Sequence, residues 1–133
     1  TLRCSNPEQR TIGVIRYINC FRKKPGMSDE EFRKYWCNDR FNELVAQVAE
    51  LSNAVRHAKN LALKVQATEQ LIEDRGIGEP YDGVLEYWWQ DASQLMEKYR
   101  LPEAIALFEE MSEYQKQFID LSRSAAFFTE DDG

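Results

Sequence analysis

The segment Tyr81–Trp89, with the sequence YDGVLEYWW, constrains the fold more than any other part of the chain. Its aromatic and branched residues favour extended structure, and its length suits one strand. Successive side chains of a strand point to opposite faces, so Leu85 and Tyr87 share one face while Val84 and Trp88 share the other. A strand with apolar residues on both faces needs cover on both sides, because a large exposed apolar patch is a liability.

The clearest local signal is a capping box at the start of a helix. The Ser28 hydroxyl can accept a hydrogen bond from the Glu31 amide while the Glu31 side chain reaches back. Met27 and Phe32 occupy the two positions of a hydrophobic staple. The sequence therefore predicts a helix that begins at about Asp29.

The other elements follow from hydrophobic periodicity and from turn residues. The apolar stripe of the first helix changes phase across residues 37–40, which predicts a bend or a break before the helix closes at residues 52–53. Residues 68–80 are a polar excursion with one helical turn, and the sequence leaves open whether they form a lid. Further strands are predicted at Thr11–Arg22, Ala54–Gln66 and Leu121–Thr129, and further helices from Asp91 to about Arg100 and from Pro102 to about Phe118.

The predicted order β-α-β-β-α-β is typical of an α+β, ferredoxin-like domain, in which an antiparallel four-stranded sheet carries both helices on one face. We expect one such domain over residues 1–133, with a polar lead at 1–10 and an acidic tail at 130–133. Helices on one face leave the other face bare, and a second copy of the chain is its simplest cover. We therefore expect a homodimer.

Composition argues against several classes of partner. The net charge of −6 and the pI near 4.9 disfavour nucleic-acid binding, and no stretch approaches the ~20 apolar residues of a membrane span. The three cysteines (Cys4, Cys20, Cys37) are widely spaced and the chain has one histidine, so we expect no metal site. Reduced thiols and a polar N-terminus without an apolar signal core are typical of a cytoplasmic protein.

Three stretches resemble the EthD family of the dimeric α/β-barrel superfamily. They are FRKKPGMSDEEF at residues 21–32 with Tyr35-Trp36, YDGVLEYW at residues 81–88, and LSRS at residues 121–124. The resemblance implies that two sheets face one another in a dimer and enclose a mostly apolar barrel. Relatives include fungal decarboxylases of anthraquinone-type polyketides, polyketide cyclases and a lactone methylisomerase, which generally need no metal or organic cofactor.

The chain departs from this family in two places. Many relatives carry His-Ala-Pro-Leu after the Tyr-Trp pair, where this chain has Arg40-Phe41-Asn42-Glu43-Leu44. They also often carry Asn-His in the second strand, where this chain has Asn60-Leu61. Both departures remove a histidine, so His57 would have to act from another position.

Two residues are candidate proton carriers. His57 titrates near neutrality and can act as a general acid or base; the alternative is a surface histidine flanked by Arg56 and Lys59. Glu86 would have a raised pKa inside an apolar barrel; the alternative is an ion pair with an arginine such as Arg16, Arg22 or Arg56.

Other candidates are hydrogen-bond donors and aromatic platforms. Asp39 and Arg40 lie where the helix stripe changes phase, and Arg40 could hold a carboxylate or enolate, unless both are solvated. Tyr17 and Asn19 share a strand face and could bind a carbonyl or phenol oxygen. The aromatic candidates for substrate binding, with the core as their alternative, are Tyr35, Trp36 and Trp88. Cys37 is the one cysteine worth testing as a nucleophile.

Together these features predict a cofactor-independent lyase or isomerase that acts on an aromatic or polyketide-like small molecule in secondary metabolism or catabolism. Cyclisation, dehydration, decarboxylation and isomerisation remain open, because all four need a proton carrier, hydrogen-bond donors and a dry pocket. One alternative is a non-catalytic binder or accessory protein with the same pocket. Another is a structural dimerisation module whose barrel is filled by side chains.

Overall fold

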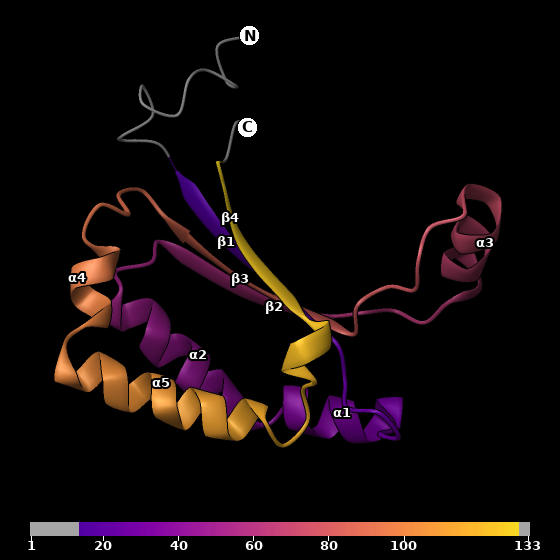
Figure 1. Ribbon diagram of the computed structural model, residues 1–133, viewed down its shortest axis with the longest axis horizontal. Coiled ribbons are helices and arrows are strands. Elements are labelled where there is room, and N and C mark those ends of the chain that lie inside the picture. The colour runs from indigo at the N-terminus through magenta and orange to yellow at the C-terminus, as the bar shows by residue number, and fades with distance from the viewer. Residues whose placement is uncertain (1–13, 131–133) are drawn as a thin grey trace, which may run out of the picture.

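The computed structural model describes residues 14–130, which form a four-stranded antiparallel sheet with helices on one side (Figure 1). The predicted ferredoxin-like arrangement is confirmed, and the strands lie in the order β2-β3-β1-β4. The polar lead and the last three residues of the acidic tail lie outside the described residues. The strands are β1 (Ile15–Phe21), β2 (Arg56–Leu61), β3 (Gly83–Trp89) and β4 (Ala125–Glu130).

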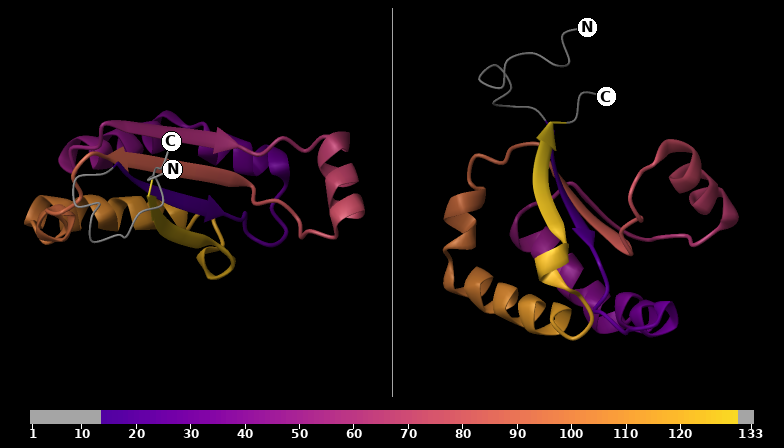
Figure 2. Two further views of the ribbon diagram at one scale, coloured as in Figure 1. Left: turned by 90° about the horizontal axis from the view of Figure 1, so that it is seen from above. Right: turned by 45° about the vertical axis from the view of Figure 1, so that its right-hand side comes forward.

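Four α-helices lie on one side of the sheet, and Figure 2 shows α2 and α5 behind the four strands. These four helices are α1 (Asp29–Trp36), α2 (Asp39–Leu51), α4 (Leu95–Tyr99) and α5 (Pro102–Gln115). A fifth helix, α3 (Gln66–Arg75), stands away from this layer in both figures. The opposite side of the sheet, which we call the open face, carries no helix layer among the described residues.

The two predictions about the first helix are confirmed. The Ser28 hydroxyl accepts a hydrogen bond from the Glu31 amide at 3.1 Å and caps α1. α1 ends at Trp36, and the side chain of Asn38 accepts from the Arg40 amide at 2.8 Å to cap α2. The phase change in the apolar stripe is therefore a break between two helices, each of which turns its own apolar face to the sheet.

Several element boundaries differ from prediction, among them the first residues of β2, β3 and α4. β2 ends at Leu61 instead of Gln66, and the expected single helical turn is wrong because α3 runs over ten residues. Gly76 ends α3 in the left-handed conformation with φ of 65°, a common way for a helix to stop. The predicted strand from Leu121 begins with a short 3₁₀ turn, η2 (Leu121–Arg123), before β4 starts.

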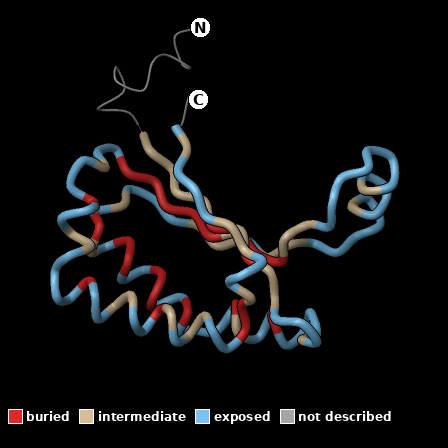
Figure 3. Tube along the Cα trace, viewed as in Figure 1, coloured by how far each residue is buried: buried red, intermediate tan, exposed pale blue. Residues whose placement is uncertain are grey.

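The core lies between the sheet and the helices, where buried residues concentrate in Figure 3. Tyr87 and Trp89 of β3 point into it, as does Phe21 of β1. The Trp89 indole donates to the Ser52 hydroxyl at 3.0 Å, so its buried polar atom is satisfied. Further core residues come from the helices and their ends: Phe32, Trp36, Phe41, Leu44, Val45, Val48, Met111, Phe118 and Ile119.

The open face carries the other half of each strand's side chains. Glu86 and Trp88 are only 7% and 9% exposed there, because two arginines cover them. Arg16 forms an ion pair with Glu86, and the guanidinium carbons of Arg16 and Arg56 lie 4.9 and 4.5 Å from the Trp88 ring centroid. Phe127 of β4 remains 47% exposed, so part of this face is apolar and accessible.

Candidate functional site

A small cavity of about 200 Å³ lies between the covered face of the sheet and the helices. We call it the tyrosine cavity, since three of its lining residues are tyrosines. An apolar cavity of about 150 Å³ holds benzene, so this space suits a molecule of one or two rings. Its lining residues are Tyr17, Asn19, Leu85 and Tyr87 from the sheet, Val48 from α2, Tyr99 from α4, and Phe108, Met111, Ser112 and Gln115 from α5.

The three tyrosine hydroxyls differ in their partners. Tyr87 donates to the Val45 carbonyl at 3.2 Å, which fixes its ring. Within residues 14–130, the hydroxyls of Tyr17 and Tyr99 have no hydrogen-bond partner, so both remain free to bind a ligand. Phe128 stacks on the Tyr17 ring at 4.6 Å, and Phe108 meets the Tyr99 ring edge-on at 5.0 Å.

The tyrosine cavity holds its phenols in the neutral form. Burial raises the pKa of Tyr17 above its ordinary value, and burial together with the nearby Tyr17 raises the pKa of Tyr99. Burial also raises the pKa of Tyr87, with smaller contributions from Tyr99 and Tyr17. A neutral phenol is a hydrogen-bond donor at neutral pH, so these groups can meet a carbonyl or phenolate oxygen.

Asn19 lines the sheet side of the tyrosine cavity. Its side-chain nitrogen donates to the Leu85 carbonyl at 3.2 Å, and the residue is 9% exposed. This bond spans β1 and β3 and fixes the side-chain amide against the sheet. The amide carries a second N–H and a carbonyl oxygen, which leaves it able to bind a ligand as well.

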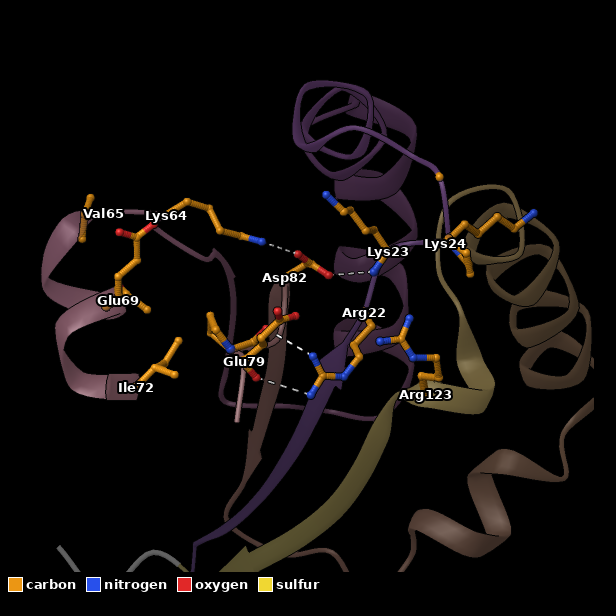
Figure 4. A pocket seen from close by; sticks show the side chains of 14 residues that line it. Arg22, Lys23, Lys24, Lys64, Val65, Glu69, Ile72, Glu79, Asp82 and Arg123 are labelled. Carbon is orange, nitrogen blue, oxygen red and sulfur yellow. Dashed lines mark hydrogen bonds and ion pairs between the residues drawn. The ribbon is translucent and has the colours of Figure 1, made fainter. Parts of the chain in front are cut away.

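A larger hollow of about 380 Å³ lies at the base of α3, and Figure 4 shows its charged lining. Most of these charges already have partners. Lys64 lies 2.8 Å from Asp82, which also accepts from the Lys23 amide, and Arg22 donates to the carbonyls of Glu79 and Pro80. These contacts form a structural network that joins the α3 segment to the rest of the domain. We therefore take the tyrosine cavity as the candidate site.

Two of the predicted site residues meet in the tyrosine cavity. Tyr17 and Asn19 share the covered face of β1, as the strand periodicity predicts. Their proposed roles as hydrogen-bond donors stay predictions.

The predicted proton carriers lie elsewhere. Glu86 is on the open face in an ion pair with Arg16, the arrangement given above as its alternative. His57 is exposed on β2, opposite Tyr87 in register, with a distance of 6.4 Å between the two ring centroids. Neither side chain lines the tyrosine cavity.

The remaining predicted residues are also dispersed. Asp39 and Arg40 are exposed at the start of α2, where Arg40 pairs with Glu43 and Glu110. Tyr35 and Trp36 pack in or against the core under α1, and Trp36 is 2% exposed. Trp88 lies on the open face between two arginines. The structure therefore does not assemble these residues with Tyr17 into one site.

Sequence reasoning missed most of the helical side of the cavity. Phe108, Met111, Ser112 and Gln115 occur at positions i, i+3, i+4 and i+7, which line one face of a helix. Ser112 and Gln115 are polar residues on that otherwise apolar face, and this exception could have indicated a ligand site. Tyr87 also lies directly opposite Tyr17 in the strand register, which a predicted pairing of these strands would have indicated.

Among residues 14–130, no group of three or more His, Cys, Asp or Glu side chains is placed to hold a metal ion. The helices described here are all too short or too polar to cross a bilayer.

Comparison with known proteins identifies one family. The EthD domain matches residues 24–122, which is most of the chain. Among curated proteins, none matches this sequence.

Three solved structures are similar in fold. A dimeric protein of unknown function with a ferredoxin-like fold from Bacteroides fragilis is 14% identical, with a TM-score of 0.57 over 89% of this chain and 96% of its own. Hydroxynitrile lyase from Passiflora edulis is 12% identical, with a TM-score of 0.56 over 90% and 94%. A variant of SnoaB, a cofactor-independent oxygenase from Streptomyces nogalater, is 14% identical, with a TM-score of 0.50 over 88% and 91%.

Proposed function

Since this chain belongs to the EthD family, we propose that it is a cofactor-independent lyase or isomerase that acts, as a homodimer, on a small aromatic or polyketide-like molecule. The substrate binds in the tyrosine cavity. The observation that carries this proposal is the pair of free hydroxyls, Tyr17 and Tyr99, inside a cavity with mainly apolar walls. A cytoplasmic location also remains a prediction.

The lining of the cavity favours reactions that need hydrogen-bond donors more than a strong base. Its polar side chains are all uncharged: three tyrosines, one asparagine, one serine and one glutamine. Neutral phenols held in a mainly apolar setting stabilise an oxyanion that develops during a reaction, because the donors are already oriented. Abstraction of a weakly acidic proton would need a carboxylate, an imidazole or an amine as the base, and this lining supplies none of them.

Among the four reactions, decarboxylation makes the smallest demand on this site. In an ortho-hydroxy acid the ring carbon that bears the carboxylate first takes a proton from a tyrosine hydroxyl, while the ortho hydroxyl gives up its proton to that tyrosine and becomes a carbonyl. The bond to the carboxylate then breaks, carbon dioxide leaves, and the electron pair restores the aromatic ring and leaves the negative charge on the former carbonyl oxygen. Tyr17 and Tyr99 donate to that oxygen, which finally takes a proton from water. The substrate brings its own negative charge, and contact of its carboxylate with the mainly apolar walls favours the loss of that group as carbon dioxide.

A non-catalytic binding protein is the second candidate. The neutral lining supports it too, because hydrogen bonds and apolar contacts suffice to hold an aromatic ligand. Binding without turnover would depend little on pH below the pKa of the tyrosines. Catalysis would instead give product, and a rate that follows the ionisation of the substrate carboxylate.

The test is turnover of one- and two-ring ortho-hydroxy aromatic acids, followed by carbon dioxide release and product chromatography. Tyr17→Phe and Tyr99→Phe should each lower kcat/KM by about a hundredfold to a thousandfold, the loss expected for one donor to an oxyanion. Tyr81→Phe is the matched control, since Tyr81 lies outside the cavity under the Arg22 guanidinium. Its kcat/KM should stay within about twofold of wild type.

Two outcomes would overturn the catalytic proposal. One is ligand binding in the cavity, measured by calorimetry, with no product from any acid in the panel, which would leave the binding protein. The other is turnover that Tyr17→Phe and Tyr99→Phe leave unchanged, which would place the chemistry elsewhere.

A further inference from the structure

Residues 62–80, which we call the arm, lack the packing that a helix of this length needs. The arm contains α3, and against the described part of the chain none of the α3 residues is buried. Isolated helices shorter than about 12–15 residues are only marginally stable in water, and α3 has ten residues. Something outside the described chain must therefore pack on the arm if α3 is to persist.

The arm carries an unusual share of exposed apolar side chains. Of the large hydrophobic residues that are exposed within residues 14–130, four lie on the arm: Leu63, Val65, Leu71 and Ile77. Leu71 and Ile77 are 50% and 49% exposed. Figure 3 shows the arm almost entirely as exposed or intermediate chain, in contrast to the body.

The position of the arm indicates what covers it. In Figure 1 the arm rises from the ends of β2 and β3 on the side of the open face, away from the helix layer, and the turned view of Figure 2 agrees. Lys64 and Asp82 tie its base to the body at 2.8 Å, so its direction is fixed by an ion pair with a buried carboxylate. Any molecule bound to the open face would therefore contact the side of the arm.

Charge complementarity favours a second copy of this chain as that molecule. The arm carries four carboxylates against two cations, and one of those cations, Lys64, is held by Asp82. The open face carries Arg56, which lies over Trp88 and has no carboxylate partner among residues 14–130. An acidic arm and a basic position on one chain become complementary when two copies meet.

A two-fold axis would place the arm of one copy next to Arg56 of the other copy. β2 begins at Arg56 and leads into the arm after Leu61, so the two features lie at opposite ends of the same strand. A two-fold axis that runs between facing sheets and across their strands turns the second copy end for end. Each arm then stands beside the end of the other sheet that carries Arg56.

We propose that the arm is an intersubunit clasp: Leu71 and Ile77 pack on a second copy seated on the open face, and the acidic residues Glu73 and Asp74 meet that copy's Arg56. This inference rests on the homodimer proposed above and adds the element that holds it. It explains why α3 is exposed in a single chain and why the arm projects to the open side.

The first experiment measures the dimer dissociation constant by analytical ultracentrifugation over a dilution series, without substrate. Leu71→Glu and Ile77→Glu should each raise the dissociation constant at least about thirtyfold, because each substitution occurs twice in a symmetric dimer. Met96→Glu is the matched control, because Met96 is 64% exposed on α4, away from the arm. It should change the dissociation constant by less than about threefold. Circular dichroism checks that each variant remains folded.

The second experiment exchanges charges between the arm and Arg56 to test whether they meet across the dimer. Arg56→Glu should weaken the dimer, and combining it with Glu73→Arg and Asp74→Arg should restore most of the affinity. The clasp is overturned if wild type is monomeric at 100 μM as a purified protein, if the Leu71 and Ile77 variants dimerise as tightly as Met96→Glu, or if the charge exchange restores nothing. Because no substrate is used, these outcomes are independent of whether the tyrosine cavity performs catalysis.

Discussion

Gly83 is the residue whose replacement by alanine most directly tests the packing behind the site. It begins β3, and a Cβ at this position would lie 2.6, 2.7 and 2.9 Å from the Cη2, Cζ3 and Cζ2 atoms of the Trp36 indole. Trp36 is 2% exposed and is stacked against Phe32 at 5.6 Å, with Phe41 edge-on at 5.3 Å. Rings on two sides therefore oppose a shift of the indole away from the added Cβ.

The magnitude follows from two opposing effects of Gly83→Ala. Overpacking of a core costs about 1–3 kcal/mol, and the upper end applies because the clash is with a rigid buried ring. Alanine returns about 0.4–1 kcal/mol, since it reduces the freedom of the unfolded chain. We therefore expect a net loss of about 2 kcal/mol in the free energy of unfolding, or roughly 6–10 °C in Tm.

Urea denaturation of Gly83→Ala, followed by tryptophan fluorescence and circular dichroism, measures this loss. Gly78→Ala is the matched control, because a Cβ there meets nothing within 4 Å, and it should be neutral or slightly stabilising. Trp36→Phe should relieve part of the clash, so the double variant should lose at least about 1 kcal/mol less than the two single losses together. A Gly83→Ala protein as stable as Gly78→Ala would refute the reasoning.

Two further predictions concern stability. Ser28→Ala should lower the free energy of unfolding by about 1 kcal/mol, because the Glu31 amide loses its acceptor at 3.1 Å; an unchanged urea midpoint would contradict the cap. The raised pKa values of Tyr17, Tyr87 and Tyr99 mean that the unfolded chain ionises these groups first. The contribution of these tyrosines to stability should therefore be constant below about pH 9 and should be lost as pH rises through about 10 and above. Urea titrations at several pH values check this, and a rise in stability above pH 10 would contradict it.

The fold was largely predictable because its signals are local. The capping box at Ser28 and the alternating strand at Tyr81–Trp89 depend on neighbouring residues alone, and both are confirmed, although the strand begins at Gly83. α3 was underestimated because its polar composition suggested a loop, although Gln66–Arg75 contains several good helix formers and Gly76 follows as a C-terminal stop. Amphipathicity is weak in a helix that does not pack on its own chain, so periodicity gave little indication of it.

The candidate site was only partly predictable because it depends on which face of the sheet the helices cover. Strand parity groups Tyr17 with Asn19, and it separates both from Glu86 once the register is known. Parity does not say which group meets the helices, so the sequence left open whether Glu86 faces a pocket or pairs with an arginine. Tyr99 enters the cavity from α4, after a connection whose path the sequence does not indicate.

Register therefore decides which chemistry reaches the cavity. If β1 slipped by one residue against β3, the side chains of β1 would turn to the other face, which would carry Arg16 toward the helices, separate it from Glu86 and remove Tyr17 from the cavity. Breaking this ion pair would leave Arg16 unpaired among apolar helices and Glu86 unpaired on the open face, whereas Tyr17 loses little by being buried. The Asn19 bond to the Leu85 carbonyl also exists only in the observed register. The same pairings that hold the sheet together thus keep the cavity neutral, which is the property that the proposed chemistry requires.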